Sequence, residues 1–173
     1  MLAMHKTQKE TVREAELENK SFIPLMCAIV VVLSLSWLAS ISMDTASNEW
    51  YRSLERSAYN PPGWAFGVVW PALYVMMTIA AWHVWRNRKR YAIGKPLAYF
   101  VAQLAINIGW TPIFFGMQAP TLALFSLATI IILAGITTFH FFRVTFKAGM
   151  LMLPYMAWLC FAFYLNGYIV THN

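Results

Sequence analysis

The stretch PGWAFGVVWPALYVMMTIAAWHVW, residues 62–85, decides the fold of this chain. It contains no Asp, Glu, Lys or Arg, and it exceeds the roughly 20 helical residues that cross a bilayer. Its leading proline fits the first turn of a helix, where a missing N–H costs nothing. In lipid the backbone must satisfy its own hydrogen bonds, so the stretch predicts a transmembrane helix.

The whole chain has the same character, with 60% hydrophobic and only 12% charged residues. A soluble domain carries about 25% charged residues, so this composition indicates an integral membrane protein. Five apolar runs bounded by proline, glycine or charged residues predict spans at 22–41, 62–85, 96–115, 120–142 and 149–170. We therefore expect an all-α membrane protein, a bundle of five transmembrane helices over residues 22–173. Residues 1–21 read as a polar cytosolic tail and the loop 42–61 as a lid over the bundle.

Basic residues predict the orientation. Eleven of the 13 Lys and Arg residues fall in the tail, the second loop and the fourth loop, and Arg52 and Arg56 lie in the first loop. This bias places the N-terminus in the cytoplasm and the C-terminus outside, and it fits a bacterial cytoplasmic membrane best. The interleaved basic and aromatic residues typical of nucleic-acid binding are absent, so we expect no nucleic-acid partner.

Reactive groups are scarce inside the predicted spans. No carboxylate lies in a span, and there is no nucleophile–base set, no metal-ligand spacing and no phosphate-binding glycine loop. His83 and His140 lie near cytoplasmic helix ends and read as interfacial side chains. Cys27 and Cys160 read as buried packing residues. The sequence thus favours no conventional enzyme, no metal and no required cofactor.

Aromatic and amide side chains instead share faces on three of the predicted helices. The stripes are Phe66, Trp70 and Tyr74; Gln103, Asn107, Trp110 and Phe114; and Tyr155, Trp158, Ala162, Leu165 and Asn166. They predict a cavity in the outer half of the bundle, under the lid. Two alternatives stay open: the aromatic rings pack against neighbouring helices, and Asn107 bonds only to another helix.

Three longer segments carry a family resemblance. They are WYRSLERSAYNPPGWAFGVVWPALYVMMTIAAWHVW at 50–85, AQLAINIGWTPIFFGMQAPTLAL at 102–124 and AGMLMLPYMAWLCFAFYLNGYIVTHN at 148–173. Together they resemble the TspO/MBR family, the tryptophan-rich sensory proteins of bacteria, which are related to the mitochondrial translocator protein. The resemblance implies five transmembrane helices and frequently a homodimer, with the third helix often at the interface.

The resemblance also implies a pocket under the first loop that binds porphyrins and, in some members, sterols or benzodiazepine-type ligands. The positions that match the family's pocket are Tyr51, Pro61, Trp70, Tyr74, Asn107, Trp110, Phe114, Trp158, Ala162 and Leu165. The sterol motif of eukaryotic members needs a basic residue after a tyrosine, and none follows Tyr164 or Tyr168.

Three functions are compatible with this pattern. The first is a tetrapyrrole-binding membrane protein, a sensor or carrier, with a porphyrin as ligand, the bilayer as its surroundings and no further cofactor. Arg52 and Arg56 then either meet the propionates or remain solvated loop charges. The second is light- and oxygen-dependent protoporphyrin degradation, for which the resemblance implies Trp70 and Trp158 as catalytic residues. The third is a structural or partner-binding scaffold.

Overall fold

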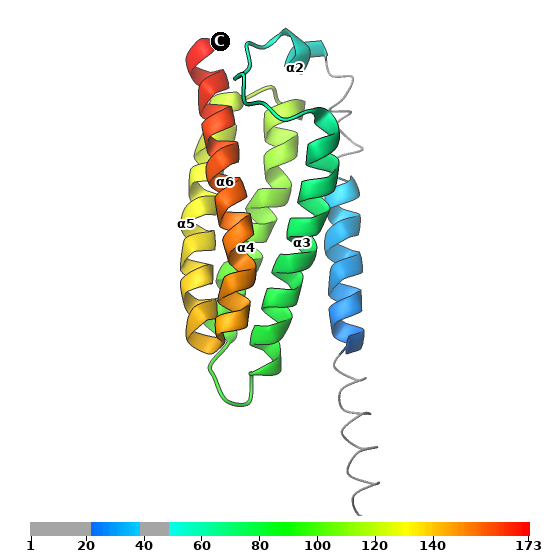
Figure 1. Cartoon of the computed structure of the whole chain (residues 1–173), viewed down its shortest axis with the longest axis vertical. Helices are drawn as coiled ribbons and strands as arrows, with labels where there is room; N and C mark the ends of the chain where they lie inside the picture. Colours follow the sequence, from blue (N-terminus) through cyan, green and yellow to red (C-terminus); the bar gives the residue numbers. More distant parts are fainter. Residues whose placement is uncertain (1–21, 39–48) are drawn as a thin grey trace, which may run out of the picture.

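The computed structural model describes residues 22–38 and 49–173 of the chain (Figure 1). The expected tail at 1–21, the end of the first span at 39–41 and the start of the lid at 42–48 lie outside these residues. Within them, an N-terminal helix covers Phe22–Leu38. It is followed by α2 Glu49–Ser53, α3 Gly63–Arg86, α4 Gly94–Thr111, the π-helix η1 Pro112–Gly116, α5 Pro120–Val144 and α6 Phe146–His172.

The five-helix membrane fold is confirmed. Four helical stretches are long and apolar enough to cross a membrane, and the N-terminal helix is a fifth, shorter apolar one. With α4 and η1 taken together as one span, the boundaries predicted for the last four spans differ from the observed ones by at most three residues. The short helix α2 inside the lid was not predicted, because its sequence EWYRS carries no helical hydrophobic period.

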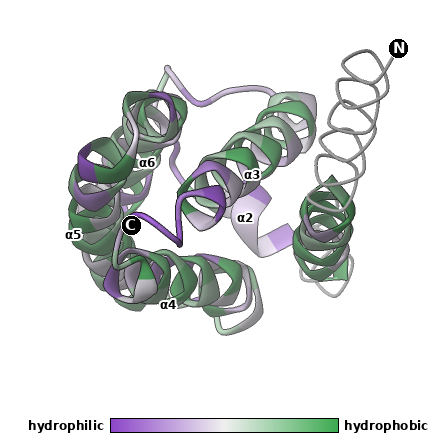
Figure 2. Ribbon diagram, turned by 90° about the horizontal axis from the view of Figure 1, so that it is seen from below, coloured by the Kyte–Doolittle hydropathy of each residue, from purple (hydrophilic) through white to green (hydrophobic). Residues whose placement is uncertain are grey.

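The helices pack in an order that differs from their order along the chain. α3 packs on α6, α6 on α5, and α5 on α4, while the N-terminal helix contacts α3 (Figure 2). Tyr155, Phe141 and Met77 lie in the shared core, together with alanines that let the helices approach closely. Only 22–33% of each long apolar span is buried within the chain, so the remaining apolar surface faces lipid or lines the interior cavity described below.

The connection between α5 and α6 corrects one prediction. A loop from 143 to 148 was expected because Arg143 and Lys147 interrupt the apolar pattern, but the break is the single extended residue Thr145. Both basic side chains sit on helical residues at the end of the bundle. Long cationic side chains extend from a helix end into the interface, so they do not require a loop.

The two cysteines correct another prediction. Cys27 and Cys160 lie in the spans as expected, but both are exposed on the outside of the bundle and not buried. Apolar spans show little helical asymmetry in hydropathy, so the sequence alone does not indicate which side of a span faces lipid.

The bundle has two distinct ends. The described part of the lid (residues 49–61) and the end of α6 lie together at one of them, which we call the lid end (Figure 1). The α3–α4 turn and the α5–α6 junction lie at the other, which we call the basic end. Its basic residues are Arg86, Arg88, Lys89, Arg90, Lys95, Arg143 and Lys147. The charge bias predicts that this end faces the cytoplasm.

Candidate ligand-binding cavity

The lid is attached to the last turns of α6. The Glu55 backbone N–H donates to Asn173 Oδ1 over 2.9 Å, and Asn173 Nδ2 donates to the Glu55 carbonyl over 3.2 Å. Further down α6, the hydroxyls of Ser57 and Tyr164 lie 3.1 Å apart. These contacts join segments more than 100 residues apart in the chain, and they hold the lid over the end of the bundle.

The inner side of the lid rests on aromatic rings of η1, the π-helix that follows α4. The Tyr51 ring lies 6.1 Å from that of Phe114 and 5.3 Å from that of Phe115. Trp50 contacts Phe114 at 5.5 Å. The Tyr51 hydroxyl donates to Asn60 Oδ1 over 3.2 Å, which joins the two arms of the lid. The lid therefore holds the Tyr51 ring against the aromatic rings of η1 at the lid end of the bundle.

The rings of Phe114 and Phe115, which contact the lid, belong to the π-helix η1. The Met117 N–H donates to the Pro112 carbonyl over 2.9 Å, five residues back, so the turn is wider than an α-turn. Single π-turns occur frequently at functional sites. The prediction treated this part of the third span as plain α-helix. Its proline and two consecutive phenylalanines gave no signal for the wider turn.

A cavity of about 1280 Å³ lies beneath the lid, between α3, α4, α6 and the N-terminal helix. It exceeds the roughly 300–1,000 Å³ of a common ligand site, so a large ligand can be accommodated. The structure brings all ten residues of the predicted site together in its lining. They are Tyr51, Pro61, Trp70, Tyr74, Asn107, Trp110, Phe114, Trp158, Ala162 and Leu165.

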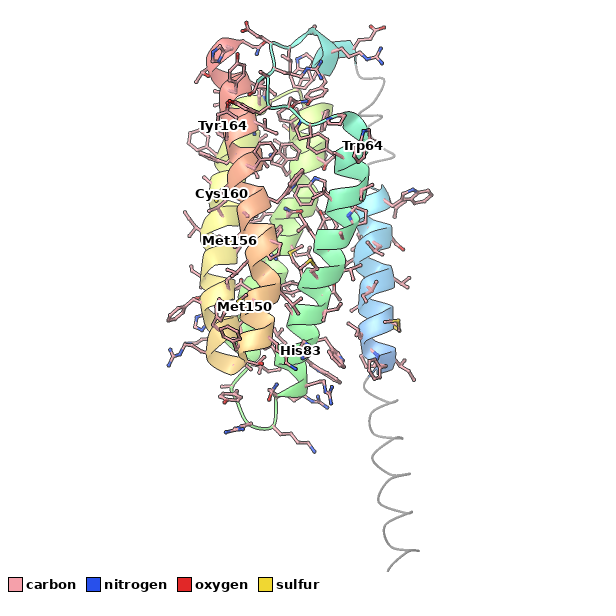
Figure 3. The ribbon with its side chains drawn as sticks, in the orientation of Figure 1. Trp64, His83, Met150, Met156, Cys160 and Tyr164 are labelled. Atoms are coloured by element: carbon pink, nitrogen blue, oxygen red, sulfur yellow. The ribbon has the colours of Figure 1, made fainter. Side chains whose placement is uncertain are left out.

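One wall of the cavity is a cluster of rings from α3 and α6. The Trp70 and Trp158 rings lie 6.3 Å apart and nearly perpendicular, at 87°. Trp70 stacks on Tyr74 at 5.6 Å, and Phe66 meets Trp158 edge-on at 5.9 Å. Figure 3 draws the side chains as sticks and labels Trp64 of α3 and Tyr164 of α6 near the lid end. Edge-to-face and stacked contacts fix each ring and leave a rigid aromatic surface.

A second aromatic wall comes from α4 and η1. Trp110 stacks on Phe114 with 4.9 Å between centroids and 18° between planes. Trp110 Nε1 donates to the Ala123 carbonyl of α5 over 3.1 Å. The hydrogen bond satisfies the polar edge of the indole and holds its ring in place. Two fixed aromatic walls thus belong to the same cavity.

The floor of the cavity is a chain of hydrogen bonds across three helices. The Tyr74 hydroxyl donates to Asn107 Oδ1 over 2.6 Å, and Asn107 Nδ2 donates to the Tyr155 hydroxyl over 3.2 Å. The Tyr155 hydroxyl in turn donates to Gln103 Oε1 over 2.6 Å. Asn107 therefore lines the cavity and also bonds to neighbouring helices, so the alternative in which it bonds only to another helix does not hold. Gln103 and Tyr155 lie behind the lining.

Charge in the lining is restricted to the mouth. Among the described lining residues, Arg52 and Arg56 are the charged ones, and both belong to the lid. The Arg56 guanidinium lies 5.1 Å from the centroid of the Tyr51 ring. A cavity with apolar aromatic walls and two cations at its opening fits a flat, apolar ligand with acidic substituents.

Sequence reasoning missed the contribution of the N-terminal helix. Leu33, Ser34, Ser36 and Trp37 also line the cavity. The two serines were the available signal, since hydroxyls are uncommon on a surface that faces only lipid. The remaining additions to the lining come mainly from neighbours of predicted residues. They are Asn60, Gly63, Gly67, Pro71, Thr111, Phe115, Leu127 and Ile169.

The helical spacing predicted that Asn166 shares the inward face of the last helix, and Asn166 does line the cavity. With its amide oriented to suit its partners, Nδ2 donates to the Pro120 carbonyl over 3.0 Å. Oδ1 accepts from the Leu124 N–H over 3.1 Å. The side chain thus joins α6 to the first turn of α5 at the depth of the cavity.

His83 and His140 lie outside the lining of the cavity. His140 stacks on Tyr99 at 5.7 Å, and His83 lies against Trp82 at the basic end. No group of three or more His, Cys, Asp or Glu side chains in the described part of the chain is arranged to hold a metal ion.

Comparison with known proteins agrees with this architecture. The TspO/MBR family profile matches residues 27–171. The chain is 33% identical to the "Tryptophan-rich protein TspO" of Chlorobaculum tepidum over 90% of this chain and 99% of that protein. It is 38% identical to the "Tryptophan-rich sensory protein" of Cereibacter sphaeroides, with 69% and 73% covered. It is 36% identical to the human "Translocator protein", with 72% and 75% covered. The chain belongs to the TspO/MBR family.

Proposed function

We propose that this membrane protein binds a tetrapyrrole of the porphyrin or haem type in the cavity under the lid, and acts as a sensor or carrier. The observation that carries the proposal is the combination of two rigid aromatic walls with a cationic mouth. Trp70 and Trp158 contribute one wall, Trp110 and Phe114 the other, and Arg52 and Arg56 belong to the lid.

The aromatic walls suit the face of a macrocycle. A porphyrin is a large flat π-system, and stacked or edge-on contacts with fixed rings contribute about 0.5–1.5 kcal/mol each beyond the burial of apolar area. Because the cavity holds about 1280 Å³, the ring fits without unfolding the lid. Apolar burial provides most of the affinity, at about 25 cal/mol per Å².

The arginines suit the edge of the same ligand. The two propionates of a porphyrin lie on one side, so a ring held between the walls presents them toward the mouth. Arginine pairs with carboxylate through parallel N–H···O bonds, which are stronger than bonds between neutral groups. Arg52 and Arg56 therefore select acidic tetrapyrroles over neutral ones.

The role of sensor or carrier rests on the relatives. Their names include a sensory protein and a translocator protein. In the described spans no acidic side chain is present to couple movement of a ligand to an ion gradient. We therefore propose passive binding and release through the lid end, without ion coupling.

The test is a titration of the detergent-solubilised chain with protoporphyrin, followed by quenching of tryptophan fluorescence. Trp70→Phe together with Trp158→Phe should weaken binding about tenfold, since two indole contacts are reduced to smaller ones. The matched control is Trp64→Phe with Trp85→Phe, which also removes two indoles but outside the cavity lining. Equal affinity in wild type and the cavity variant would refute the proposal.

The arginines are tested with a matched pair of ligands. Arg52→Gln with Arg56→Gln should weaken binding of protoporphyrin but leave binding of its dimethyl ester unchanged, because the ester carries no charge. If both ligands lost affinity equally, the arginines would act on the lid structure and not on the carboxylates. If neither changed, the arginines would be solvated loop charges.

A second candidate is degradation of the bound porphyrin in light and oxygen. The observation that favours it is the direct contact of Trp70 with Trp158 at 6.3 Å beside the cavity, where an indole can exchange an electron with an excited ring. Illumination of the purified complex separates the two functions. A stable absorption spectrum indicates a binder, and bleaching to a new pigment indicates an enzyme.

Self-association is a further proposal. We propose a homodimer through α4. A methyl group added at Gly109 of this helix would have no other helix of the described residues within 4 Å. Small residues on a lipid-facing helix allow close approach of a second helix. Gly109→Leu should shift the dimer to monomer in analytical ultracentrifugation.

The membrane that holds the protein is proposed from the charge bias to be the bacterial cytoplasmic membrane.

A further inference from the structure

The hydrogen bonds at the floor of the cavity all run in one direction. Each group donates to the next, from Tyr74 through Asn107 and Tyr155 to Gln103. The chain of bonds ends at the Gln103 amide, whose Nε2 is buried and has no hydrogen-bond partner among the described residues. Gln103 is 0% exposed. Because a buried amide N–H without a partner is rarer in proteins than a carbonyl oxygen with spare capacity, this direction leaves the less favourable group unpaired.

The same side chains can form the chain of bonds in the opposite direction, if the two amide groups turn over. The Gln103 N–H then donates to the Tyr155 hydroxyl, which donates to the Asn107 carbonyl. Asn107 Nδ2 in turn donates to the Tyr74 hydroxyl. Hydroxyl and amide groups permit this reversal because each of them can both donate and accept. Reversal pairs the Gln103 N–H and moves the free donor to the Tyr74 end.

The Tyr74 end lies at the cavity, whereas the Gln103 end does not. Tyr74 and Asn107 belong to the lining, and Gln103 lies behind it. Ser36 of the N-terminal helix also belongs to the lining and forms a side-chain hydrogen bond with the Tyr74 hydroxyl. A donor released on Tyr74, or passed on to Ser36, is therefore available to a ligand. Reversal thus transfers a hydrogen-bond donor from the core to the floor of the cavity.

The ligand group that suits this floor is a neutral carbonyl. Arg52 and Arg56 are the charged residues of the described lining, and both belong to the lid. A carboxylate at the floor would be buried without a cation, which is costly, but a carbonyl oxygen accepts a hydrogen bond without carrying a charge. When the propionates of a porphyrin lie at the mouth, the opposite edge of the macrocycle points toward the floor.

We propose that the floor binds a neutral carbonyl substituent on the edge of the tetrapyrrole opposite its propionates. The Tyr74 hydroxyl is the donor, and Gln103 is a positioning residue that controls the direction of the chain of bonds. The inference rests on the proposed function, since it names the substituent that the same cavity selects. A porphyrin without a carbonyl still binds through the aromatic walls, so the two proposals fail separately.

The experiment compares two porphyrins that differ at that edge alone, by quenching of tryptophan fluorescence in the detergent-solubilised full chain. Mesoporphyrin carries two ethyl groups there and diacetyldeuteroporphyrin two acetyl groups, and both keep the two propionates. The wild type should bind the diacetyl compound about fivefold more tightly, which is the contribution of one hydrogen bond between neutral groups. Tyr74→Phe should reduce this ratio of affinities to about one.

Two further variants separate the floor from general structure. Tyr164→Phe is the matched control, because it removes a phenol hydroxyl outside the lining, and it should leave the ratio at about fivefold. Gln103→Leu should keep or increase the ratio, because without the Gln103 acceptor the Tyr155 hydroxyl donates to Asn107 and the bonds already run toward Tyr74. The acetyl group gives an independent reading. Its C=O stretch in resonance Raman spectra should lie at lower frequency in the wild type than in Tyr74→Phe.

Each contrary outcome has a definite meaning. Equal affinity of the wild type for both porphyrins would overturn the inference and leave the proposed function standing, whereas binding of neither would refute both. A ratio that survives Tyr74→Phe would overturn the assignment in favour of Trp158, whose indole N–H is also buried without a partner among the described residues. A ratio lost in Gln103→Leu would overturn the reversal of the bonds.

Discussion

The hydrogen-bonded floor of the cavity gives the sharpest prediction about stability. Asn107→Leu keeps the volume of the side chain but removes its bonds to the Tyr74 and Tyr155 hydroxyls, which measure 2.6 and 3.2 Å. Interhelical hydrogen bonds in membranes contribute on average about 0.6 kcal/mol each. The Tyr74 hydroxyl keeps a side-chain hydrogen bond with Ser36 after this change, so it is not left without a partner. We therefore expect a loss of about 1 kcal/mol in the free energy of unfolding, the sum of the two bonds.

The assay is reversible unfolding in mixed micelles of dodecylmaltoside and SDS, followed by circular dichroism. Tyr74→Phe alone should cost about 0.6 kcal/mol, because it removes one of the two bonds. The double variant Tyr74→Phe with Asn107→Leu should cost about as much as Asn107→Leu alone, since both partners of the first bond are then apolar. A loss below about 0.5 kcal/mol for Asn107→Leu, or strict additivity in the double variant, would refute the reasoning.

Three further predictions concern the α5–α6 junction, the lid and the outer surface of α6. Gly149→Ala should cost about 1–3 kcal/mol of unfolding free energy, because the new methyl group would overlap the Phe142 ring; thermal unfolding measures the loss. Asn173→Ala should accelerate hydrogen exchange of the Glu55 amide about fivefold, since that N–H loses its acceptor; exchange mass spectrometry measures it. Cys160→Ser should change stability by less than about 0.5 kcal/mol, because the thiol is exposed; the same unfolding assay applies.

Each of these predictions has its own contrary result. An unchanged melting temperature for Gly149→Ala would mean that the junction between α5 and α6 is looser than described. Unchanged exchange at the Glu55 amide would mean that the lid is held by other contacts. A loss above about 1 kcal/mol for Cys160→Ser would mean that this thiol packs against a partner, such as a second copy of the chain.

The fold was largely predictable because the bilayer restricts the alternatives. An apolar run such as 62–85 has only one stable form in lipid, so its length and proline fix the helix almost to the residue. Features that depend on side-chain length or on turn geometry escaped the same reasoning. Arg143 and Lys147 read as loop residues, and η1 read as ordinary helix.

The cavity was predictable in part for a similar reason. Helical spacing puts Trp70 and Tyr74, or Asn107 and Trp110, on a single face, and unusual polar and aromatic residues mark that face as inward. The contribution of the N-terminal helix was hidden because its composition is almost uniformly apolar. The attachment of Asn173 to the lid joins distant segments, and no local pattern indicates such a contact.

The central claim is that the space between the two aromatic walls holds a tetrapyrrole. The most direct measurement is an experimental structure of the chain with protoporphyrin bound. We predict a macrocycle between Trp70 and Trp158 on one side and Trp110 on the other, with its carboxylates paired to Arg52 and Arg56. A macrocycle bound on the lipid-facing surface, with the cavity beneath the lid filled by side chains or lipid, would contradict the account.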